Sequence, residues 1–417
     1  MRFSIHTLGT RGDMQPYLAL ARGLRRRGHD VLVVAPAQFA AMAENEGIGF
    51  AALPGAFLEL LESREVKETI GKSGAGFGAG FKLLKHYRGL MGGLLDAEWQ
   101  AARTFQPDAI LYHAKALGAP HIAERLGISR FLASPLPGFT PTSAFPTPVL
   151  PFADLGLLNR ASHGLMIHGG NVMFASTVGT WRADVLGLPK RGKPGATAGT
   201  LYGYSPHVLP KPADWGADVA VTGYWFLDSP DWQPDSALAA FLAGGDAPVY
   251  VGFGSMPGAE PQRLTQLVVE GLRRAGKRGL IASAGGALQR MDGLDDMHFI
   301  AGAPHDRLFP LMQATMHHGG AGTTGAALRA GRPTAIVPFL GDQPFWARRV
   351  QQLGVGPAAL NKHKMTASDI AAAVSAMAEP GMQQRAAGLG KAIAGEDGVG
   401  GAMAFIERRL AVLPGGA

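Results

Sequence analysis

The chain has 417 residues, of which 47% are hydrophobic and 17% charged, and this composition predicts a globular protein of two or three domains. It contains no cysteine, which excludes disulfide bonds and thiolate metal sites and is typical of a reducing compartment. Its formal net charge is +7, but the basic residues form short runs rather than one patch, which argues against a nucleic-acid-binding protein.

The cellular location is inferred from the first residues and from the apolar runs. A strand pattern begins at residue 2, so we expect no signal peptide. Each apolar run is shorter than a membrane span. We therefore expect a cytoplasmic protein. Because the net charge is positive, peripheral contact with the inner, anionic face of the membrane stays open.

The first predicted unit is a strand at residues 2–8, a helix at 14–27 and a strand at 30–35. The right-handed crossover of such a unit predicts a parallel sheet. Its turn lacks a full GxGxxG motif, and no acidic residue ends the second strand, so we expect no nicotinamide cofactor. Asp13 lies in this turn, where α/β sheets bind ligands. It could cap the helix or act on a ligand, and the residues alone leave both open.

Two charged or polar residues accompany Asp13. Arg11, in the same turn, could face an anionic ligand or could lie on the surface. A strand at residues 107–113 ends at His113, at the same edge of the predicted sheet. His113 could pair with Asp13 or contact a ligand, although a hydrogen-bonded structural histidine is the favoured interpretation.

The rest of the first half is less regular. Residues 51–97 show no clear pattern until a helical spacing of apolar residues that includes Tyr87. Residues 134–151 form a long proline-rich loop with Phe139, and loops of this length are often binding elements. We place the domain boundary near Pro212, in an aromatic segment punctuated by prolines.

The second half repeats the pattern of the first. Strands are expected at residues 249–253, 279–283, 298–301, 314–318 and 334–339, and helices at 261–275, 323–330, 366–378 and 402–413. Two α/β halves, each with its own strand–helix–strand start, predict two Rossmann-like domains facing each other across a cleft.

A glycine turn in the second half is the strongest functional signal. It follows a strand at His318 and precedes a helix that Thr323 could cap. Such a turn exposes backbone N–H groups at the positive end of a helix dipole, where phosphates bind. Asp342 and Gln343 follow the next strand. A structural turn with a buried histidine is the alternative, but the combination favours a phosphate-bearing ligand.

Two motifs resemble a known family. HHGGAGTT and PFLGDQPFWARRV together are similar to the donor-binding signature of UDP-dependent family 1 glycosyltransferases, which have the GT-B architecture. GTRGDMQP, LYGYSP and VTGYWFLD extend the resemblance to the bacterial and fungal sterol 3-beta-glucosyltransferase branch. It implies an acceptor-binding domain at 1–212, a nucleotide-sugar-binding domain at 213–395, and a C-terminal helix within 396–417 that packs back on the first domain.

The resemblance also implies site residues. Asp13 matches the catalytic base, and a carboxylate in that role needs a raised pKa or tight geometry. Asp342 and Gln343 match a pair that binds sugar hydroxyls, and the backbone of Ala303 matches a position that holds uracil. The implied donor-binding set is Arg11, Ser255, Ala303, His305, His318, Gly320, Gly322, Thr323, Asp342 and Gln343. The implied acceptor pocket includes His113, Phe139 and Tyr87.

Two departures leave the nucleotide open. Gly302 stands where many relatives stack uracil on Trp, and Ala326 where plant relatives bind ribose with Glu. A thymidine diphosphate sugar therefore stays an alternative to a UDP-sugar. No DxD pair ends a strand, so we expect a reaction without metal or cofactor, the nucleotide sugar being a co-substrate.

The expected function is an inverting hexosyltransferase that moves glucose to a hydroxyl of an apolar acceptor such as a sterol or triterpenoid. A polyketide, macrolide, flavonoid or other natural product is the alternative acceptor. A non-catalytic nucleotide-sugar-binding protein is the alternative of another class.

Overall fold

The computed structural model describes residues 1–55, 77–256 and 260–412. Within them, the N-terminal half forms a seven-stranded sheet in the order β3-β2-β1-β4-β5-β6-β7, with every strand pair parallel. The strands are β1 (Arg2–His6), β2 (Asp30–Pro36), β3 (Gly49–Leu53), β4 (Ala109–Tyr112), β5 (Ser129–Ser134), β6 (Gly199–Tyr202) and β7 (Val219–Val221). Runs such as the fully buried AILY of β4 are typical of a parallel sheet covered on both faces.

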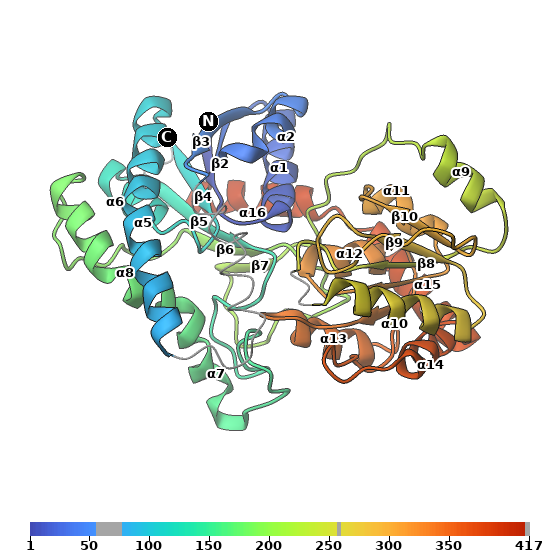
Figure 1. The fold of residues 1–417 in the computed structure, drawn as a ribbon. Coiled ribbons are helices and arrows are strands. Elements are labelled where there is room, and N and C mark those ends of the chain that lie inside the picture. Colours follow the sequence, from blue (N-terminus) through green and yellow to red (C-terminus); the bar gives the residue numbers. More distant parts are fainter. Residues whose placement is uncertain (56–76, 257–259, 413–417) are drawn as a thin grey trace.

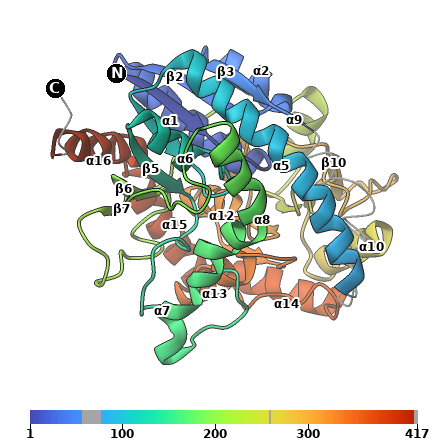
Figure 2. The same ribbon diagram turned by 90° about the vertical axis from the view of Figure 1, so that its left-hand side faces the viewer.

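Helices cover this sheet. They are α1 (Arg11–Arg26), α2 (Ala40–Asn45), α5 (Phe77–Phe105), α6 (Ala119–Leu126), α7 (Asn159–Ser162) and α8 (Gly164–Asp184), with short 3₁₀ turns at Ala37–Phe39 and Gly156–Leu158. Residues 77–105 are one helix, which confirms the helical spacing expected around Tyr87 and extends past residue 97, where that region was expected to end. Helix α5 packs against α8, and Figure 2 shows both on the outer face of the N-terminal half.

The C-terminal half forms a second parallel sheet in the order β10-β9-β8-β11-β12. Its strands are β8 (Val249–Gly252), β9 (Gly279–Ala282), β10 (Met297–Ile300), β11 (Ala314–His317) and β12 (Thr334–Ile336). Its helices are α9 (Ser236–Ala243), α10 (Pro261–Arg274), α11 (His305–Leu308), α12 (Ala321–Arg329), α13 (Gln343–Gln352), α14 (Ala367–Met377) and α15 (Pro380–Ala394), with a 3₁₀ turn at Phe309–Leu311. Figure 1 shows the two sheets side by side, each in its own layer of helices.

Strand order fixes where a ligand can bind. The chain changes direction between β1 and β4 in the first sheet, and between β8 and β11 in the second. Loops that leave such a pair of parallel strands in opposite directions open a crevice at the carboxyl ends of the strands. The crevice positions are therefore the residues that follow β1, β4, β8 and β11.

The chain crosses between its halves twice. Strand β7 follows Pro212 but pairs with β6, so the first sheet extends past the boundary that we predict there. Helix α16 (Gly398–Val412) returns to the N-terminal half, where it packs against α1 and β6. Figure 1 shows α16 in red beside the N-terminal sheet. Among the described residues, no helix combines the length and apolar character needed to cross a membrane.

We predict that Phe405→Ala destabilises the N-terminal domain, because the Phe405 ring is only 2% exposed within the core shared by α1 and the sheet. Truncating a buried Phe costs about 3–5 kcal/mol of unfolding free energy. Val412→Ala is the control, because Val412 on the same helix is 73% exposed and its loss should cost less than about 0.5 kcal/mol. Chemical denaturation measures both, and equal midpoints would contradict the role given to α16.

Candidate functional site

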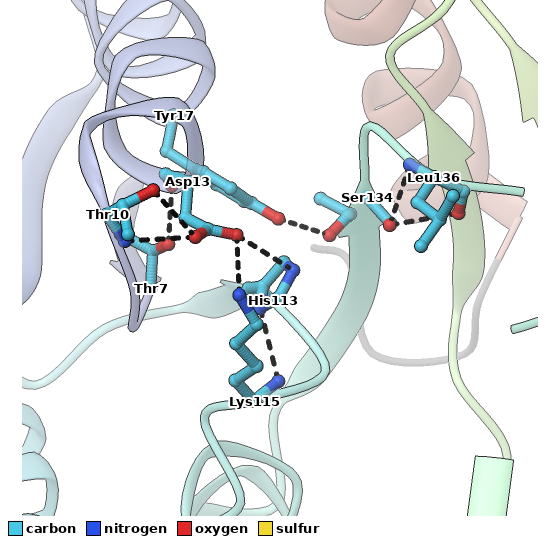
Figure 3. Close-up of polar contacts among 9 residues, drawn as sticks. Thr7, Thr10, Asp13, Tyr17, His113, Lys115, Ser134 and Leu136 are labelled. Carbon is cyan, nitrogen blue, oxygen red and sulfur yellow. Dashed lines mark hydrogen bonds and ion pairs between the residues drawn. The ribbon is translucent and has the colours of Figure 1, made fainter. Parts of the chain in front are cut away.

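Asp13 is held in the first turn of α1. Thr10 is the N-cap of the helix, and its N–H donates to Asp13 Oδ2 at 3.0 Å. The helix therefore begins earlier than predicted, and Asp13 is its third residue rather than its cap. The other carboxylate oxygen, Oδ1, accepts from Lys115 Nζ at 2.8 Å and lies 3.7 Å from His113 Nε2. Figure 3 shows the Asp13 carboxylate between these partners.

His113 and Lys115 follow β4, the strand next to β1. The His113 N–H donates to the His6 carbonyl at 2.9 Å, and the Lys115 N–H donates to His113 Nδ1 at 3.2 Å. Because Nδ1 accepts, the hydrogen-bond network assigns the ring proton to Nε2, which faces Asp13. Sequence reasoning missed Lys115. The sequence pattern that could have indicated Lys115 is a basic residue two positions after a histidine at the end of a strand.

The charges at this site favour an ionised Asp13. Burial raises the pKa of Asp13, but Lys115, His113 and the Thr10 N–H outweigh burial and bring that pKa below its usual value. Burial and the Lys115 charge lower the pKa of His113 to about 4, against the opposing pull of Asp13. At neutral pH the site therefore holds a carboxylate, a neutral imidazole and an ammonium. A raised pKa would make Asp13 a stronger base, but the pKa of Asp13 is lowered. The contacts of its two carboxylate oxygens nevertheless hold the group in a tight geometry.

The glycine turn after β11 is built around His317. This side chain is fully buried, its Nδ1 accepts from the Gly319 N–H at 3.0 Å, and its Nε2 lies 2.8 Å from Thr334 Oγ1. Gly319 has φ of +90°, and a Cβ there would lie 2.5 Å from Ile336 Cγ2. Only glycine fits this position. The structural histidine of the turn is thus His317, which leaves His318 for another role.

His318 lies between two glycines. A Cβ on Gly320 would lie 2.6 Å from His318 Nε2, and a Cβ on Gly254 would lie 2.9 Å from its Cε1. Its Nδ1 is buried without a hydrogen-bond partner among the described residues, and burial lowers the pKa of His318 to about 4. A buried polar nitrogen normally has a partner. Its setting, beside the N-terminus of a helix, suits an anionic ligand with acceptor oxygens.

Helix α12 begins at this turn without the predicted cap. Its N-cap is Gly320, and no side chain among the described residues caps it. Thr323 lies in the first turn of the helix, partly buried, so its prediction as a cap is wrong. Gly322 is exposed and has open space where a Cβ would stand. The backbone N–H groups of this helix end are therefore open to a ligand.

The remaining donor-side residues lie on neighbouring loops. Ser255 is exposed and follows β8, next to Gly254. Ala303, partly buried, precedes α11. His305 begins α11, with its ring stacked on Phe309 at 4.2 Å between centroids. Burial, the Arg11 charge and His318 together lower the pKa of His305 to about 4. Arg11 of the first half therefore lies within electrostatic range of His305 in the second.

Asp342 and Gln343 differ in their contacts. Burial raises the pKa of Asp342, Trp346 Nε1–H opposes this by donating to Oδ2 at 2.7 Å, and Asp13 raises the pKa further. Asp342 therefore lies close enough to Asp13 for their charges to interact across the domain boundary. Gln343 is buried, and its Oε1 accepts from the N–H groups of Phe339 at 2.6 Å and Leu340 at 3.0 Å.

The Gln343 Oε1 thus forms hydrogen bonds within its own loop. The Gln343 Nε2 donates to Met256 Sδ, in another loop, at 3.3 Å. The expectation that Gln343 binds sugar hydroxyls stays a prediction, because its Nε2 carries a second N–H besides the one that donates to Met256. Of the predicted pair, Asp342 alone is placed toward the other domain. Gln343 fixes the loop from which Asp342 projects.

The predicted acceptor residues are only partly brought together. His113 lies beside Asp13, as described above. Phe139 is partly buried against the apolar cluster that includes Tyr112, and its N–H donates to Tyr202 Oη at 3.2 Å. Tyr87 lies on α5, but its side chain falls outside the described residues. No three His, Asp or Glu side chains in the described part of the chain are grouped to hold a metal ion.

A pocket of about 360 Å³ lies at the domain boundary beside the site. Arg11 and Gln15 of α1 line one side, together with residues of α2, and residues 227–232 line the other. The Gln15 side chain donates to the Leu227 carbonyl at 3.1 Å, so the linker is fastened to α1 here. The pocket therefore opens between the first domain and the segment that leads into the second.

Family models match a part of each half of the chain. Residues 3–146 match the glycosyltransferase family 28 N-terminal domain, and residues 289–395 match the erythromycin biosynthesis protein CIII-like C-terminal domain. Among solved structures, the chain resembles the glycosyltransferase of kitacinnamycin, with a TM-score of 0.71 and 18% identity over 98% of both chains. It also resembles the calicheamicin glycosyltransferase CalG4, with a TM-score of 0.67 and 19% identity over 99% of both chains. These likenesses confirm the predicted GT-B fold.

Curated relatives identify the branch. Two sterol 3-beta-glucosyltransferases of Arabidopsis thaliana are 34% and 32% identical over 98% of this chain, which spans 66% and 68% of their lengths. A sterol 3-beta-glucosyltransferase of Saccharomyces cerevisiae is 33% identical over 98% of this chain, which spans 35% of it. With one plant relative matched over 68% of its length at 32% identity, the chain belongs to the GT-B glycosyltransferases of the sterol 3-beta-glucosyltransferase branch.

Proposed function

We propose that the protein transfers glucose, with inversion, from a nucleotide diphosphate sugar to a hydroxyl of a sterol or a similar apolar acceptor. The observation that supports this proposal is that each domain contributes its own group of polar residues to the domain boundary. Asp13 lies at the crevice of one sheet, while Asp342 and the unpartnered His318 Nδ1 lie at the crevice of the other. Since the chain spans about a third of the fungal relatives and about two thirds of the plant ones, their activity is carried over here only as a proposal.

The proposed step needs one base and one anion site. Asp13 accepts the proton of the acceptor hydroxyl while that oxygen bonds to the anomeric carbon. The bond from the anomeric carbon to the phosphate oxygen breaks, and its electron pair stays on the diphosphate. The N-terminus of α12, the His318 ring N–H and Arg11 stabilise that charge. Because base and leaving group lie on opposite sides of the sugar, the configuration inverts.

The nucleotide remains UDP or TDP. Gly302 is exposed, with open space where a Cβ would stand among the described residues, and Ala326 is buried within α12. Neither can stack on a base or bind a ribose hydroxyl. A solved neighbour of 20% identity, the Streptomyces glycosyltransferase SsfS6, is a complex with thymidine diphosphate. Calorimetric titration with UDP and TDP, followed by turnover with the matching sugars, distinguishes the two donors.

The membrane is the proposed source of the apolar acceptor. Residues 161–181 contain no Asp, Glu, Lys or Arg. The surface formed by α7, α8 and the preceding turn exposes large apolar side chains, with Leu157 at 101% and Val172 at 74%. Figure 2 shows α7 and α8 on one face of the N-terminal half. The apolar side chains of this surface, which lie beside the exposed Arg160 of α7, can enter the interfacial region of a bilayer, where a lipid-like acceptor is held.

We predict that Asp13→Asn lowers turnover by about 10²–10⁴-fold, because the amide cannot accept the hydroxyl proton. Donor affinity should remain, since Asp13 is on the acceptor side. Mass spectrometry of the glucoside measures turnover, and calorimetry measures donor binding. Asp30→Asn, at an exposed position on β2, is the matched control. Turnover equal to that of the control would remove Asp13 as the base and favour a non-catalytic or differently catalysed role.

We predict that His318→Ala weakens nucleotide diphosphate binding, because a hydrogen bond from the ring to a charged group is lost. Such a bond contributes about 1.5–3 kcal/mol, equivalent to about 10–100-fold in Kd. Calorimetry with UDP and TDP provides the measurement. His363→Ala is the control, since His363 is exposed in another loop of the same domain. An unchanged Kd would show that the turn is structural only.

We predict that Leu157→Asp reduces binding to anionic lipid vesicles by about tenfold or more, since inserting a Leu side chain contributes about 1.5–3 kcal/mol. Vesicle co-sedimentation measures the effect. Leu311→Asp makes the same change at a side chain 44% exposed on the other domain. If both variants sediment like the wild type, the α7–α8 surface does not contact the bilayer.

A further inference from the structure

Lys115 contacts the Asp13 carboxylate at the domain boundary. Its Nζ is 2.8 Å from Asp13 Oδ1, and its own N–H is bonded to His113 Nδ1, so both ends of the residue are fixed. The Lys115 side chain is 50% exposed, whereas that of Asp13 is 19% exposed. An exposed ion pair contributes little to stability. The pair is therefore better explained by what it does to the charge of Asp13 than by what it adds to the fold.

The groups around Asp13 can be named from each element. From α1 come the Thr10 N–H and Tyr17, whose hydroxyl is bonded to the Ala133 carbonyl at 2.5 Å. From the end of β4 come His113, with its ring proton on Nε2, and the Lys115 ammonium. From the start of α13, in the other domain, comes Asp342. The Lys115 ammonium thus bonds to the Asp13 carboxylate and acts electrostatically on the Asp342 carboxylate.

The charges that act on Asp342 include both Asp13 and Lys115. Burial raises the pKa of Asp342, the negative charge of Asp13 also raises it, and the positive charge of Lys115 lowers it. One ammonium therefore offsets charge on both carboxylates. Without that cation, the two carboxylates would repel each other across the domain boundary, and one would take up a proton at higher pH.

We infer that Lys115 is a positioning residue whose ammonium holds the Asp13 carboxylate in place as an anion at the domain boundary, within electrostatic range of Asp342. This inference rests on the proposed function, in which Asp13 accepts the acceptor proton and Asp342 accepts hydrogen bonds from sugar hydroxyls. Lys115 is not itself the base, because an ammonium has no free electron pair. Its role is to keep one carboxylate oxygen in place and both groups ionised at neutral pH.

The test is the pH profile of kcat/KM for glucosyl transfer with UDP-glucose and TDP-glucose. This parameter reports ionisations of the free enzyme. In the wild type we expect a flat profile from pH 8 down to about pH 5, since the pKa of Asp13 lies below its ordinary value. In Lys115→Met the acid limb should move up by about one pH unit or more, because the opposite charge is lost. Activity should then fall as the pH drops through the raised pKa of Asp13.

Two further variants separate this role from a structural one. Lys115→Arg keeps the cation and should restore the wild-type acid limb. Lys193→Met removes the same charge at an exposed position of the first domain and should leave the profile unchanged. The donor KM of Lys115→Met should also rise more at pH 6 than at pH 8, because Asp342 is then partly protonated.

The outcomes are distinct. If Lys115→Met loses activity equally at every pH, or if its acid limb coincides with that of Lys193→Met, the inference is overturned while the proposed function stands. If the wild type transfers no sugar from either donor, the proposed function fails. In that case calorimetric pH titration of UDP-glucose binding, with UDP as the control ligand that lacks the sugar, still reports whether Lys115 affects the ionisation of Asp342. No pH-dependent difference between the variants there would overturn the inference independently.

Discussion

The site depends on one constraint, the order of the parallel strands, which reverses once in each sheet. The reversals place the ends of β1 and β4 in one domain, and of β8 and β11 in the other, at crevices open to ligands. Helix α16 adds a second tie between the domains, because the chain leaves the C-terminal half and buries Phe405 and Ile406 in the N-terminal core. The opposition of Asp13 and His318 follows from topology rather than from any direct contact between them.

The electrostatics of the first crevice favour a fixed, ionised carboxylate over a strong base. Burial alone would raise the pKa of Asp13 and make it a better proton acceptor. The ammonium of Lys115 and the N–H of Thr10 reverse that shift and, in the same contacts, fix both carboxylate oxygens. For a reaction with inversion, the angle at which the base meets the hydroxyl matters as much as its affinity for the proton. The same contacts lower the basicity of Asp13 and fix its orientation.

The elements and the chemistry of this protein were predictable to different extents. Strand patterns located β1, β8 and β11 within a residue or two, because parallel strands are buried on both faces and carry continuous apolar runs. The motif around His318 predicted an anion site for a local reason, the glycine turn. Lys115 was missed because its partner, Asp13, is 102 residues away in sequence. The bonds from Gln343 Oε1 back to its own loop were not predictable, because a motif specifies residue types and spacing but not which side chain turns back to the backbone.

The paired histidines show why a motif needs the structure to be interpreted. In HHGG, both rings could satisfy a structural or a binding role, and the sequence cannot separate them. The strand alternation separates them, because His317 is the last residue of β11 and points into the core, where Thr334 and the Gly319 N–H bond both ring nitrogens. His318, one residue later, must then face the opposite side, toward Gly254 and the N-terminus of α12. The fully bonded His317 ring holds the turn, and the Nδ1 of its neighbour has no hydrogen-bond partner in the part of the chain that the structure describes.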